Sequence, residues 1–400
     1  MASDFGFNDS LTDELLDRAK SLQPLLLQQA PAAERNRRLA DEVVQKVRDA
    51  QLFNVCLPRR WGGLCMSATS MARIGYELAK ACPATGWVYA ISNSSAWVGS
   101  LGPDAMQEAV FADGVPLTCS AINPPGQFKE AAGGVLATGA WPYASGCYHS
   151  SWGMFGLGAK DEHGHFIPGG NIWVPMSQVT IEDTWHTAGL RGTGSNTIVA
   201  KDLFVPAHMR VMPEENTPFA PGRKHVGEAT DYFPLLPHLR SVMLGVLVGM
   251  ADAVLERVAA AAKSRGIVYT TYTRQSDSHV AQKETGEAGA MINGARVLML
   301  NACNTVDRAA LSRRPMEYLA QTRNRSETAL ATDLLVKAVE KLMYVAGSSA
   351  FMEKNDAQRY WRDLNMAARH AANVPHIGYE MYGRALLGVE PNIAPHPSFI

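Results

Sequence analysis

The first part of the chain has apolar residues at helical spacing. Five of them lie three or four positions apart: Leu11, Leu15, Ala19, Leu22 and Leu26. This spacing gives one apolar helix face, in which Pro24 predicts a kink and Pro31 predicts the end of the helix. The same periodicity predicts further helices over residues 39–52, 68–81, 86–94 and 104–111. We therefore expect residues 1–114 to form an all-helical N-terminal domain.

The pattern changes near residue 115, where glycine, proline and β-branched residues become frequent. Short runs rich in β-branched residues predict strands over residues 134–141, 171–175 and 197–205. Proline has no N–H to donate to a neighbouring strand, so Pro206 is expected to end the last of them. Residues 115–212 are therefore predicted to form a small, barrel-like middle β-domain.

Long helices return after a polar, proline-rich connection at residues 214–237. The predicted helices span residues 238–263, 280–312, 326–346 and 358–387. Pro375 is expected to break or kink the last one, because proline cannot make the helical hydrogen bond. Four long helices with short links are typical of an antiparallel four-helix bundle. We therefore expect residues 213–400 to form a bundle, and the whole chain to be of the α+β class and mainly helical.

Composition and charge exclude several classes of function. The chain has 37 Lys and Arg against 38 Asp and Glu, a net charge of −1, and no basic stripe of the kind that binds nucleic acid. The N-terminus lacks the basic and apolar regions of a signal peptide, and the most apolar run, residues 241–255, is too short to span a bilayer. The six cysteines form no CxxC pair, which indicates reduced thiols in a cytoplasmic protein without a membrane partner.

The sequence contains no motif for a metal, a nucleotide or a hydrolase triad. It has no HExxH pair and its histidines are scattered, so no metal ligands are expected. Gly192-Thr193-Gly194 lacks a third glycine three places on and precedes a predicted strand, so it is not a dinucleotide fingerprint. P-loop and GxSxG motifs are also absent.

Residues 141–152, WPYASGCYHSSW, combine small and hydroxyl side chains with aromatic ones. Ser145 offers a hydroxyl that can donate or accept, and Gly146 lets the backbone approach a ligand closely. Four aromatic residues supply flat walls: Trp141, Tyr143, Tyr148 and Trp152. Such a stretch suits a planar, partly polar ligand at the end of a strand. A buried strand and turn with two core tryptophans is the other interpretation, and composition alone favours it.

Two further segments have two interpretations each. Residues 184–197, TWHTAGLRGTGSNT, form either a backbone surface against a ligand or a loop that connects strands. In the last predicted helix, His370 follows Asp363 by seven residues, which places both on nearly the same helix face. A lone helical histidine is more often a structural residue than a catalytic one.

These segments together resemble one family, the oxygenase components of two-component flavin-dependent monooxygenases, which share the acyl-CoA dehydrogenase fold. The matching segments follow the family's order: residues 61–64 (WGGL), 141–152, 189–197 (GLRGTGSNT), 204–206 and 360–373 (YWRDLNMAARHAAN). The resemblance is strongest to enzymes that hydroxylate phenolic rings, of the hydroxyphenylacetate and secosteroid types. It implies an N-terminal helical domain, a middle β-domain, a C-terminal four-helix bundle, a homotetramer, and flavin bound between the β-domain and the bundle.

The resemblance also implies roles for individual residues. Ser145 matches the serine whose hydroxyl contacts flavin N5, and His370 matches the histidine near the reacting position. The residues expected at the flavin are Trp141, Ser145, Gly146, Cys147, Trp185, Thr193, Ser195 and Asn373. The residues expected at the substrate are Ser95, Trp97, Tyr143 and His370. Ser95 is a departure, since many relatives have a second active-site histidine there.

The implied activity is hydroxylation of an aromatic compound with O2 and reduced flavin, either FADH2 or FMNH2, through a flavin C4a-hydroperoxide. A separate NAD(P)H:flavin reductase is expected to supply the reduced flavin, because the chain has no nicotinamide fingerprint. A phenol gains from a second base, whereas the C3 carbon of indole is already electron-rich. The single histidine therefore favours an indole-like substrate over a simple phenol.

Three other functions are open to the sequence. An acyl-CoA dehydrogenase shares the fold but needs a catalytic carboxylate, and the residues around His370 provide none. An N-oxidising enzyme of the nitrososynthase type would apply the same flavin chemistry to an amine. A catalytically silent carrier of flavin or another ligand is disfavoured by the presence of both Ser145 and His370.

Overall fold

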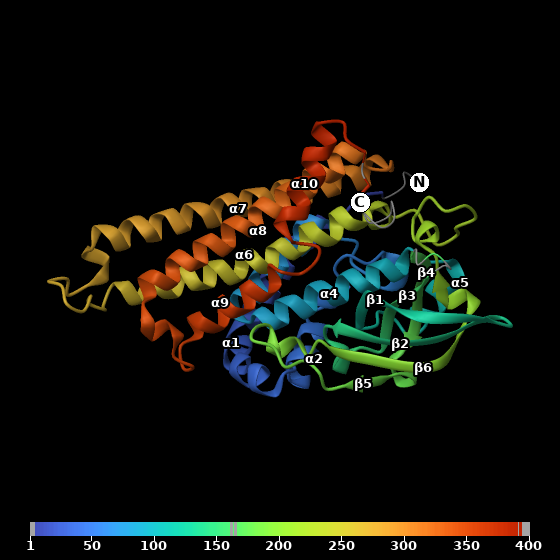
Figure 1. Cartoon of the computed structure of the whole chain (residues 1–400), viewed down its shortest axis with the longest axis horizontal. Helices are drawn as coiled ribbons and strands as arrows, with labels where there is room; N and C mark the ends of the chain where they lie inside the picture. The colour runs from blue at the N-terminus through green and yellow to red at the C-terminus, as the bar shows by residue number, and fades with distance from the viewer. Residues whose placement is uncertain (1–4, 161–162, 164–165, 391, 394–400) are drawn as a thin grey trace.

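The computed structural model describes residues 5–160, 163, 166–390 and 392–393. Helices from the first and last parts of the chain pack together, and one sheet from the middle part lies beside them (Figure 1). The mainly helical α+β architecture expected from the sequence is confirmed. None of the described helices is long and apolar enough to cross a membrane.

The N-terminal part contains the helices α1 (Thr12–Asn36), α2 (Asp41–Asp49), α3 (Ala68–Ala81), α4 (Pro83–Ser100) and α5 (Asp104–Val110). The prediction that Pro31 ends the first helix is wrong, because α1 continues to Asn36 and is capped by Arg37, which takes a left-handed φ of 54°. The buried face of α1 continues to Ala33, and this packing offsets the single hydrogen bond that proline removes. α4 is longer than predicted because almost all of its residues are buried, so no polar face marks its ends.

Among the described residues, seven strands form one sheet in the order β5-β6-β2-β1-β3-β4-β7. They are β1 (Thr118–Ala131), β2 (Gly134–Ala144), β3 (Trp152–Lys160), β4 (Phe166–Pro175), β5 (Thr180–Glu182), β6 (Asn196–Pro206) and β7 (Arg210–Val211). The three predicted strands correspond to β2, β4 and β6, and Pro206 ends β6 as expected. The prediction of three strands is too low. β1 contains two prolines and a glycine where its register with β3 shifts between Ala121 and Gly126, so its sequence does not have the pattern of a strand.

The C-terminal part contains α6 (Leu235–Ala262), α7 (His279–Ser312), α8 (Tyr318–Ala346), α9 (Asp356–Ala367) and α10 (Pro375–Leu386). The fourth predicted helix is in fact two helices, because the chain turns at residues 368–374. The expected break at Pro375 is confirmed, since this residue is the first of α10. The turn between α9 and α10 contains His370, and this placement determines the geometry of the site.

Helices α3 and α4 join the three parts of the fold into one core. α3 packs closely on α6, where a Cβ atom at Gly245 would lie 2.0 Å from the carbonyl oxygen of Ala72, so this position requires glycine. α4 lies between the bundle and the sheet (Figure 1). The hydroxyl of Ser95 on α4 donates to Ser120 Oγ of β1 at 2.9 Å. α4 is therefore the element through which the sheet and the bundle meet.

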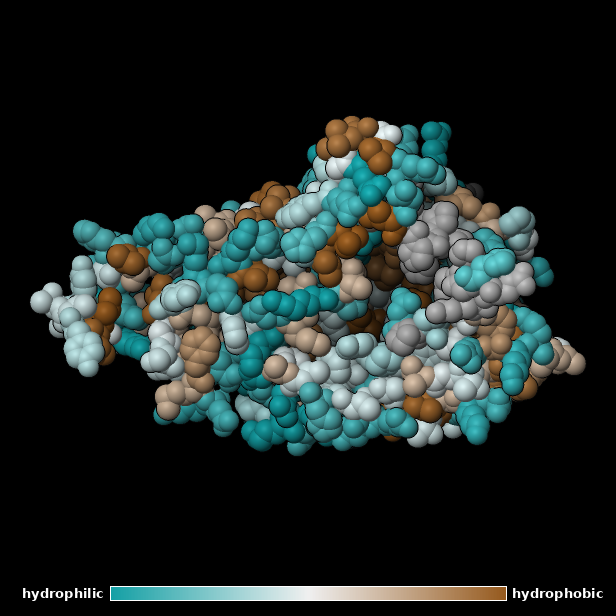
Figure 2. Space-filling model, viewed as in Figure 1, coloured by the Kyte–Doolittle hydropathy of each residue, from teal (hydrophilic) through white to brown (hydrophobic). Residues whose placement is uncertain are grey.

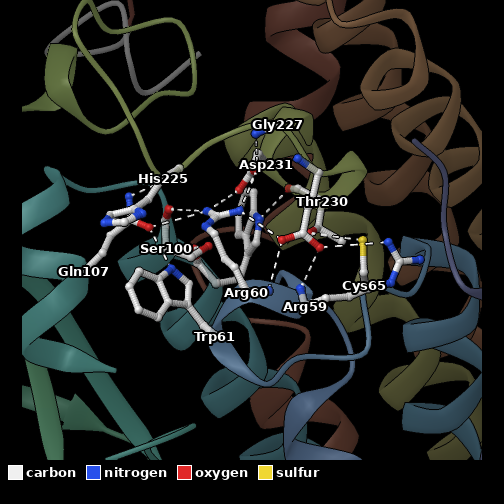
Figure 3. A network of polar contacts seen from close by, with 12 residues as sticks. Arg59, Arg60, Trp61, Cys65, Ser100, Gln107, His225, Gly227, Thr230 and Asp231 are labelled. Atoms are coloured by element: carbon white, nitrogen blue, oxygen red, sulfur yellow. Dashed lines mark hydrogen bonds and ion pairs between the residues drawn. The ribbon is translucent and has the colours of Figure 1, made fainter. Parts of the chain in front are cut away.

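The polar connection before α6 is anchored to the N-terminal helices by a network of ion pairs (Figure 3). The guanidinium of Arg60 donates to both carboxylate oxygens of Asp231, at 2.8 and 2.7 Å. The backbone N–H groups of Arg59 and Arg60 donate to the carboxylate of Glu228, at 2.7 and 3.1 Å. Asp231 is buried, so loss of Arg60 would leave a buried carboxylate without a partner and would destabilise this segment. The network fixes the segment from which α6 begins.

Candidate active site

A hollow opens between α10 and the layer formed by α4 and the sheet, and Figure 2 shows apolar residues in its depth. Trp87 of α4 contacts both residues to which the resemblance gives a catalytic role. Its indole Nε1 donates to Ser145 Oγ at 3.2 Å, and its ring meets the His370 ring edge to face at 5.5 Å between centroids. One tryptophan thus bridges two predicted site residues that are far apart in the sequence.

Ser145 lies at the start of a chain of three buried hydroxyl groups. Ser145 Oγ and Ser195 Oγ are 2.7 Å apart, and Ser195 Oγ and Thr193 Oγ1 are 2.6 Å apart. Thr193 Oγ1 donates its proton to the carbonyl oxygen of Leu190 at 2.8 Å. Pairing of β2 with β6, which aligns Ala144 with Asn196, brings the two segments together.

The direction of the hydrogen bonds in this chain follows from the one proton that each hydroxyl carries. Thr193 uses its proton on Leu190, so Ser195 must donate to Thr193, and Ser145 must donate to Ser195. Ser145 also accepts the indole N–H of Trp87. One lone pair of Ser145 Oγ is left. Ser145 is therefore arranged to accept a hydrogen bond from a ligand.

The turn after Ser145 is joined to the same loop by two contacts. The backbone N–H of Gly146 donates to the carbonyl oxygen of Thr193 at 2.8 Å, and Cys147 Sγ donates to the carbonyl oxygen of Gly194 at 3.2 Å. Gly146 has a φ of 74°, and a Cβ there would lie 3.1 Å from Val88 of α4. Burial raises the pKa of the Cys147 thiol to about 11, so this thiol stays protonated.

The aromatic residues of this region have different positions. Trp141 is fully buried, donates its Nε1–H to the carbonyl oxygen of Gly156 at 2.8 Å, and stacks on Phe155. Tyr143 is exposed and takes a left-handed φ of 68°, a strained conformation for a residue with a bulky side chain. Its ring meets the buried ring of Trp185 edge to face at 5.8 Å. Trp141 thus packs in the β-domain core, whereas Tyr143 is open to solvent.

The loop at residues 184–197 is held against α9 by the matching segment at residues 360–373. Asp363 Oδ1 accepts the backbone N–H of Leu190 at 2.5 Å. A Cβ at Gly189 would lie 2.3 Å from the carbonyl oxygen of Arg362, so the two backbones touch. Burial raises the pKa of Asp363 to about 7, and the Leu190 N–H partly opposes this rise. The matching segments at residues 189–197 and 360–373 therefore meet in space.

The expectation that His370 and Asp363 share a helix face is wrong. α9 ends at Ala367, and His370 lies in the turn that follows, where its backbone N–H bonds to the carbonyl oxygen of Ala367 at 3.1 Å. His370 Nδ1 accepts the backbone N–H of Ala372 at 3.3 Å. A neutral ring then carries its proton on Nε2. This nitrogen is consequently a hydrogen-bond donor.

His370 is exposed, although protein atoms surround its ring. Desolvation by these atoms lowers the pKa of His370 to about 4. Water that reaches the ring moderates the effect, so the lowering is complete only when a ligand displaces that water. In either case the imidazole is neutral at pH 7.

Asn373, at the end of the same turn, is the clearest candidate for a residue that binds a cofactor. It is only 1% exposed, and among the described residues neither its side-chain oxygen nor its nitrogen has a hydrogen-bond partner. A buried amide without partners costs about 1–3 kcal/mol, which a ligand with both donors and acceptors would recover. The edge of a flavin ring has such a set of groups, so the residues present fit this cofactor.

The other two residues expected at the substrate have partners within the protein. Ser95 bonds to Ser120, as described above. Trp97 is fully buried, donates its Nε1–H to the carbonyl oxygen of Thr230 at 2.8 Å, and packs on His238 at 4.4 Å between ring centroids. The indole N–H of Trp97 is therefore used within the protein, whereas Ser95 has used its proton and keeps lone pairs that can accept a hydrogen bond. In the described ranges, no three His, Cys, Asp or Glu side chains are grouped so that they could hold a metal ion.

Trp87 is the site residue that the sequence did not indicate. α4 is buried on nearly all sides, so its aromatic residues carry no periodic signal. A Cβ at Gly192 of the loop at residues 184–197 would lie 2.9 Å from Ala84 Cβ, three residues before Trp87. This close approach brings the start of α4 against the loop that contains Thr193.

Comparison with known proteins places this geometry in a family. Residues 19–113 match the family model of the acyl-CoA dehydrogenase N-terminal domain, and residues 242–375 match that of the acyl-CoA dehydrogenase C-terminal domain. The chain is similar to XiaF from Streptomyces sp., whose structure contains FADH2 and glycerol. The TM-score is 0.91 at 31% identity, over 97% of this chain and 98% of that one.

Two curated relatives are similar over almost their whole length. The FADH(2)-dependent resorcinol hydroxylase oxygenase component of Rhizobium sp. is 29% identical, over 94% of this chain and 95% of that protein. The flavin-dependent monooxygenase oxygenase subunit HsaA of Mycobacterium tuberculosis is 30% identical, over 96% of this chain and 95% of that protein. The chain therefore belongs to the family of flavin-dependent monooxygenase oxygenase subunits, which are built on the acyl-CoA dehydrogenase fold.

Proposed function

We propose that this monooxygenase takes reduced flavin from a separate NAD(P)H:flavin reductase and hydroxylates a small aromatic compound with O2. The observation that carries the proposal is the arrangement of Ser145, Trp87 and His370, in which one tryptophan contacts both a hydrogen-bond acceptor and a hydrogen-bond donor. Bound reduced flavin supplies the chemistry that activates O2. The side chains provide position, hydrogen bonds and exclusion of water.

Ser145, Gly146 and Asn373 are the residues proposed to hold the flavin. The N5 atom of reduced flavin carries a hydrogen, and Ser145 Oγ has one lone pair left to accept it. Gly146 lets the ring approach the backbone, and the Asn373 amide provides a donor and an acceptor for the polar ring edge. Thr193 and Ser195 are joined to Ser145 and Gly146 by hydrogen bonds, and Cys147 follows in the same turn. Trp185 bonds to the carbonyl oxygen of Leu190 in the neighbouring loop, whereas Trp141 packs in the β-domain core.

His370 is proposed to orient the substrate through its Nε2–H. A neutral imidazole that donates at Nε2 suits an oxygen on the substrate, such as a phenolic oxygen or a carbonyl. The expectation of an indole-like ring rested on the presence of a single histidine, and with indole that histidine would have to accept the ring N–H. The hydrogen bond from Ala372 to Nδ1 supports the opposite direction, and we therefore place a phenolic ring first and an indole-like ring second.

Product analysis with isotopically labelled O2 tests the proposal. The chain, chemically reduced flavin and a simple phenol should give a product that contains one labelled oxygen atom. Indole in place of the phenol should form less product and more H2O2. A product without label, or no product from any aromatic compound, would contradict the monooxygenase activity. Efficient conversion of indole with little turnover of the phenol would reverse the order of the two substrates.

The need for a separate reductase is tested with the purified chain alone. The proposal expects no NAD(P)H oxidation when only this chain, flavin and O2 are present, and rapid oxidation once a flavin reductase is added. NAD(P)H oxidation by the chain alone would contradict the two-component reading. Reduction of a dye by an acyl-CoA, measured in the same preparation, is expected to be absent, since residues 368–374 contain no carboxylate.

A homotetramer is also part of the proposal. Exposed apolar side chains lie on the outer helices α7 and α8: Val280, Val297, Leu311, Leu319 and Leu330. Large exposed apolar areas on a soluble protein mark interfaces with other chains. Light scattering should give the mass of four chains, and the mass of one chain would contradict the assembly.

The cytoplasm is the compartment that we propose. All six cysteines are unpaired and buried. A chain of this size that used disulfides would show at least one pair in an oxidising compartment. Fractionation of the source cells should recover the protein in the cytoplasm, and recovery outside it would contradict the assignment.

A further inference from the structure

Two arginines lie in adjoining turns of α6 and α8, where Asn324 Nδ2 of α8 donates to Ser241 Oγ of α6 at 3.2 Å, and no carboxylate of the described residues pairs with either arginine. Arg240 lies in the second turn of α6 and is only 2% exposed. Arg325 lies in α8 and is half-buried. Burial, together with the positive charge of Arg325, lowers the pKa of Arg240 to about 9. Two guanidinium groups therefore share a region that is largely closed to water.

Several nitrogen atoms of this pair have no hydrogen-bond partner. Within the described part of the chain, Arg240 Nε and Nη2 and Arg325 Nε are buried and lack an acceptor. Neither side chain is among the ion pairs formed by these residues. Arg325 Nη1 contacts Met381 Sδ of α10 at 2.9 Å, and a thioether is a weak acceptor. Each unpaired buried donor destabilises the ligand-free protein.

Other partly buried arginines of the described residues have at least one oxygen acceptor, which is a carboxylate in some cases and a backbone carbonyl in others, as for Arg257 and Arg265. Arg60 contacts Asp231 at 2.7 Å, and the guanidinium of Arg362 pairs with Glu34. The neighbour of Arg325 on the exposed side of α8, Arg323, pairs with Glu327 at 3.0 Å. Arg240 and Arg325 differ from these arginines because, in the described part of the chain, neither has an oxygen acceptor.

We propose that Arg240 and Arg325 form a binding site for an oxyanion between α6, α8 and α10. Guanidinium groups bind carboxylates and phosphates through paired hydrogen bonds, and Arg240 and Arg325 have free N–H groups for such bonds. The inference rests on the proposed function for its ligand: the oxyanion is either a carboxylate on the aromatic substrate or the phosphate of the reduced flavin.

The position of α10 connects this site to the candidate active site. α10 begins at Pro375, directly after the turn that contains His370 and Asn373. Met381, the residue that contacts Arg325, lies in the second turn of α10. A ligand bound by Arg325 would therefore lie near α10, the short helix that directly follows the turn of His370. An anionic group would thereby orient the aromatic ring or the flavin relative to Nε2 of His370.

Matched ligand pairs separate the two sources of the oxyanion. The first pair is 4-hydroxyphenylacetate and its uncharged amide, and the second is FMN and riboflavin, both reduced. Calorimetry on the full chain should show tighter binding of the charged member of one pair by about 10-fold or more, the size of one charge-assisted hydrogen bond. A preference for the acid identifies a carboxylate substrate, and a preference for FMN identifies the flavin phosphate.

Substitutions then assign the preference to this pair of residues. Arg240→Met and Arg325→Met should each reduce the preference to nearly 1, without weakening the uncharged ligand, whereas Arg325→Lys should keep part of it. Arg323→Met is the matched control and should leave the preference unchanged. Without ligand, Arg240→Met should melt at a temperature no lower than the parent, because it removes an unpaired buried charge. An arginine that serves only the fold would instead lower it.

The outcomes distinguish this site from the proposed function. Equal affinity for both members of both pairs, or a preference that survives in Arg240→Met and Arg325→Met, would overturn the oxyanion site. If O2 is still incorporated into an aromatic product in that case, the proposed function stands alone. Conversely, a clear preference for the acid without any oxygenation would support the oxyanion site and contradict the proposed function.

Discussion

The two walls of the candidate active site differ in how far their polar groups are satisfied. On the β-domain wall, Ser145, Ser195 and Thr193 form a closed hydrogen-bond chain that ends on a backbone carbonyl. On the bundle side, Asn373 in the turn after α9 and Arg240 in α6 are just as buried, yet several of their polar atoms have no partner in the described residues.

This difference indicates what each wall gains from a ligand. On the β-domain wall, folding alone satisfies all the hydroxyl groups of the chain except for one lone pair of Ser145 Oγ. This lone pair can position one group of the cofactor. On the bundle side, each buried polar group without a partner destabilises the ligand-free protein by about 1–3 kcal/mol. Ligands that reach it recover this cost, so affinity and selectivity should depend more on the bundle wall than on the β-domain wall.

The largest expected effect belongs to His370 on the bundle wall. His370→Ala removes the Nε2–H donor and should lower the rate of product formation by about 100-fold, the lower end of what a positioned acid–base group contributes. Flavin affinity should change little, because the ring meets Trp87 rather than the hydroxyl chain. Rapid mixing with product quantification measures the rate, and titration of reduced flavin measures the affinity.

An exposed histidine nearby provides the matched control for this substitution. His376 is exposed at the start of α10, and His376→Ala should leave both the rate and the affinity as in the parent. An equal loss of rate and flavin affinity in His370→Ala would identify His370 as a structural residue.

The second effect concerns the contact between the walls, through Asp363. Asp363→Ala removes the acceptor of the Leu190 N–H and should lower the free energy of unfolding by about 1–3 kcal/mol, because a buried donor is left unpaired. Asp363→Asn keeps an acceptor oxygen and should cost less. Denaturant unfolding measures both. If the two variants lose the same stability, the hydrogen bond to Leu190 is not what holds the loop to α9.

The third effect tests the direction of the hydroxyl chain on the β-domain wall. Ser145→Ala removes the proposed acceptor for flavin N5–H and should weaken binding of reduced flavin by about 10-fold, the value of about 1.4 kcal/mol for one buried hydrogen bond. The share of O2 released as H2O2 should rise as well. Peroxide and product assays in the same reaction give this ratio.

Two other serines make this test specific. Ser195→Ala removes the acceptor of the Ser145 proton, so Ser145 becomes free to turn and donate, and coupling should fall while flavin binding is largely kept. Ser177 is exposed and serves as the control. Unchanged coupling in Ser145→Ala would show that Ser145 does not contact the flavin.

The sequence predicted the β-domain wall better than the bundle wall, for a physical reason. Ser145 and Thr193 lie in segments whose glycines and small hydroxyl residues stand out in the sequence, and strand pairing between Trp141 and Ile198 leaves little freedom in how they meet. In the bundle, whether Arg240 has a partner depends on which residues of α8 and α10 surround it. Such long-range neighbours leave no pattern in the sequence of α6.

Errors in the predicted elements have the same origin. Pro31 was expected to end a helix on local grounds, but packing of α1 beyond this residue prevails. His370 was placed on a helix by a seven-residue spacing, yet the helix stops at Ala367. The prolines and the glycine of β1 hide a strand that is held by β2 on one side and β3 on the other. In each case tertiary contacts decided the outcome.

The smallest expected effect comes from His238, whose unpaired ring lies between two aromatic side chains. Its ring is fully buried, stacks on Phe233 at 4.3 Å and also packs on Trp97. Among the described residues neither ring nitrogen has a partner, and burial lowers the pKa from 6.5 to about 3. His238 therefore shows that an unpaired buried group on the bundle side can simply reduce stability.

The pH dependence of unfolding distinguishes His238 from the groups that await a ligand. The folded protein keeps His238 neutral, while the unfolded chain takes up a proton below about pH 6.5, so stability is complete above this pH and is lost as the pH falls towards 3. His238→Phe keeps the stacked ring and removes the loss of stability that protonation of His238 in the unfolded chain causes at low pH. At pH 6 the variant should gain less than about 1 kcal/mol relative to the parent, and the gain should grow by about 1.4 kcal/mol for each unit of lower pH. Saturating ligand should leave this difference unchanged, whereas it should abolish the stability gain of Arg240→Met. A difference between His238→Phe and the parent that does not vary with pH would mean that His238 is not held neutral by burial.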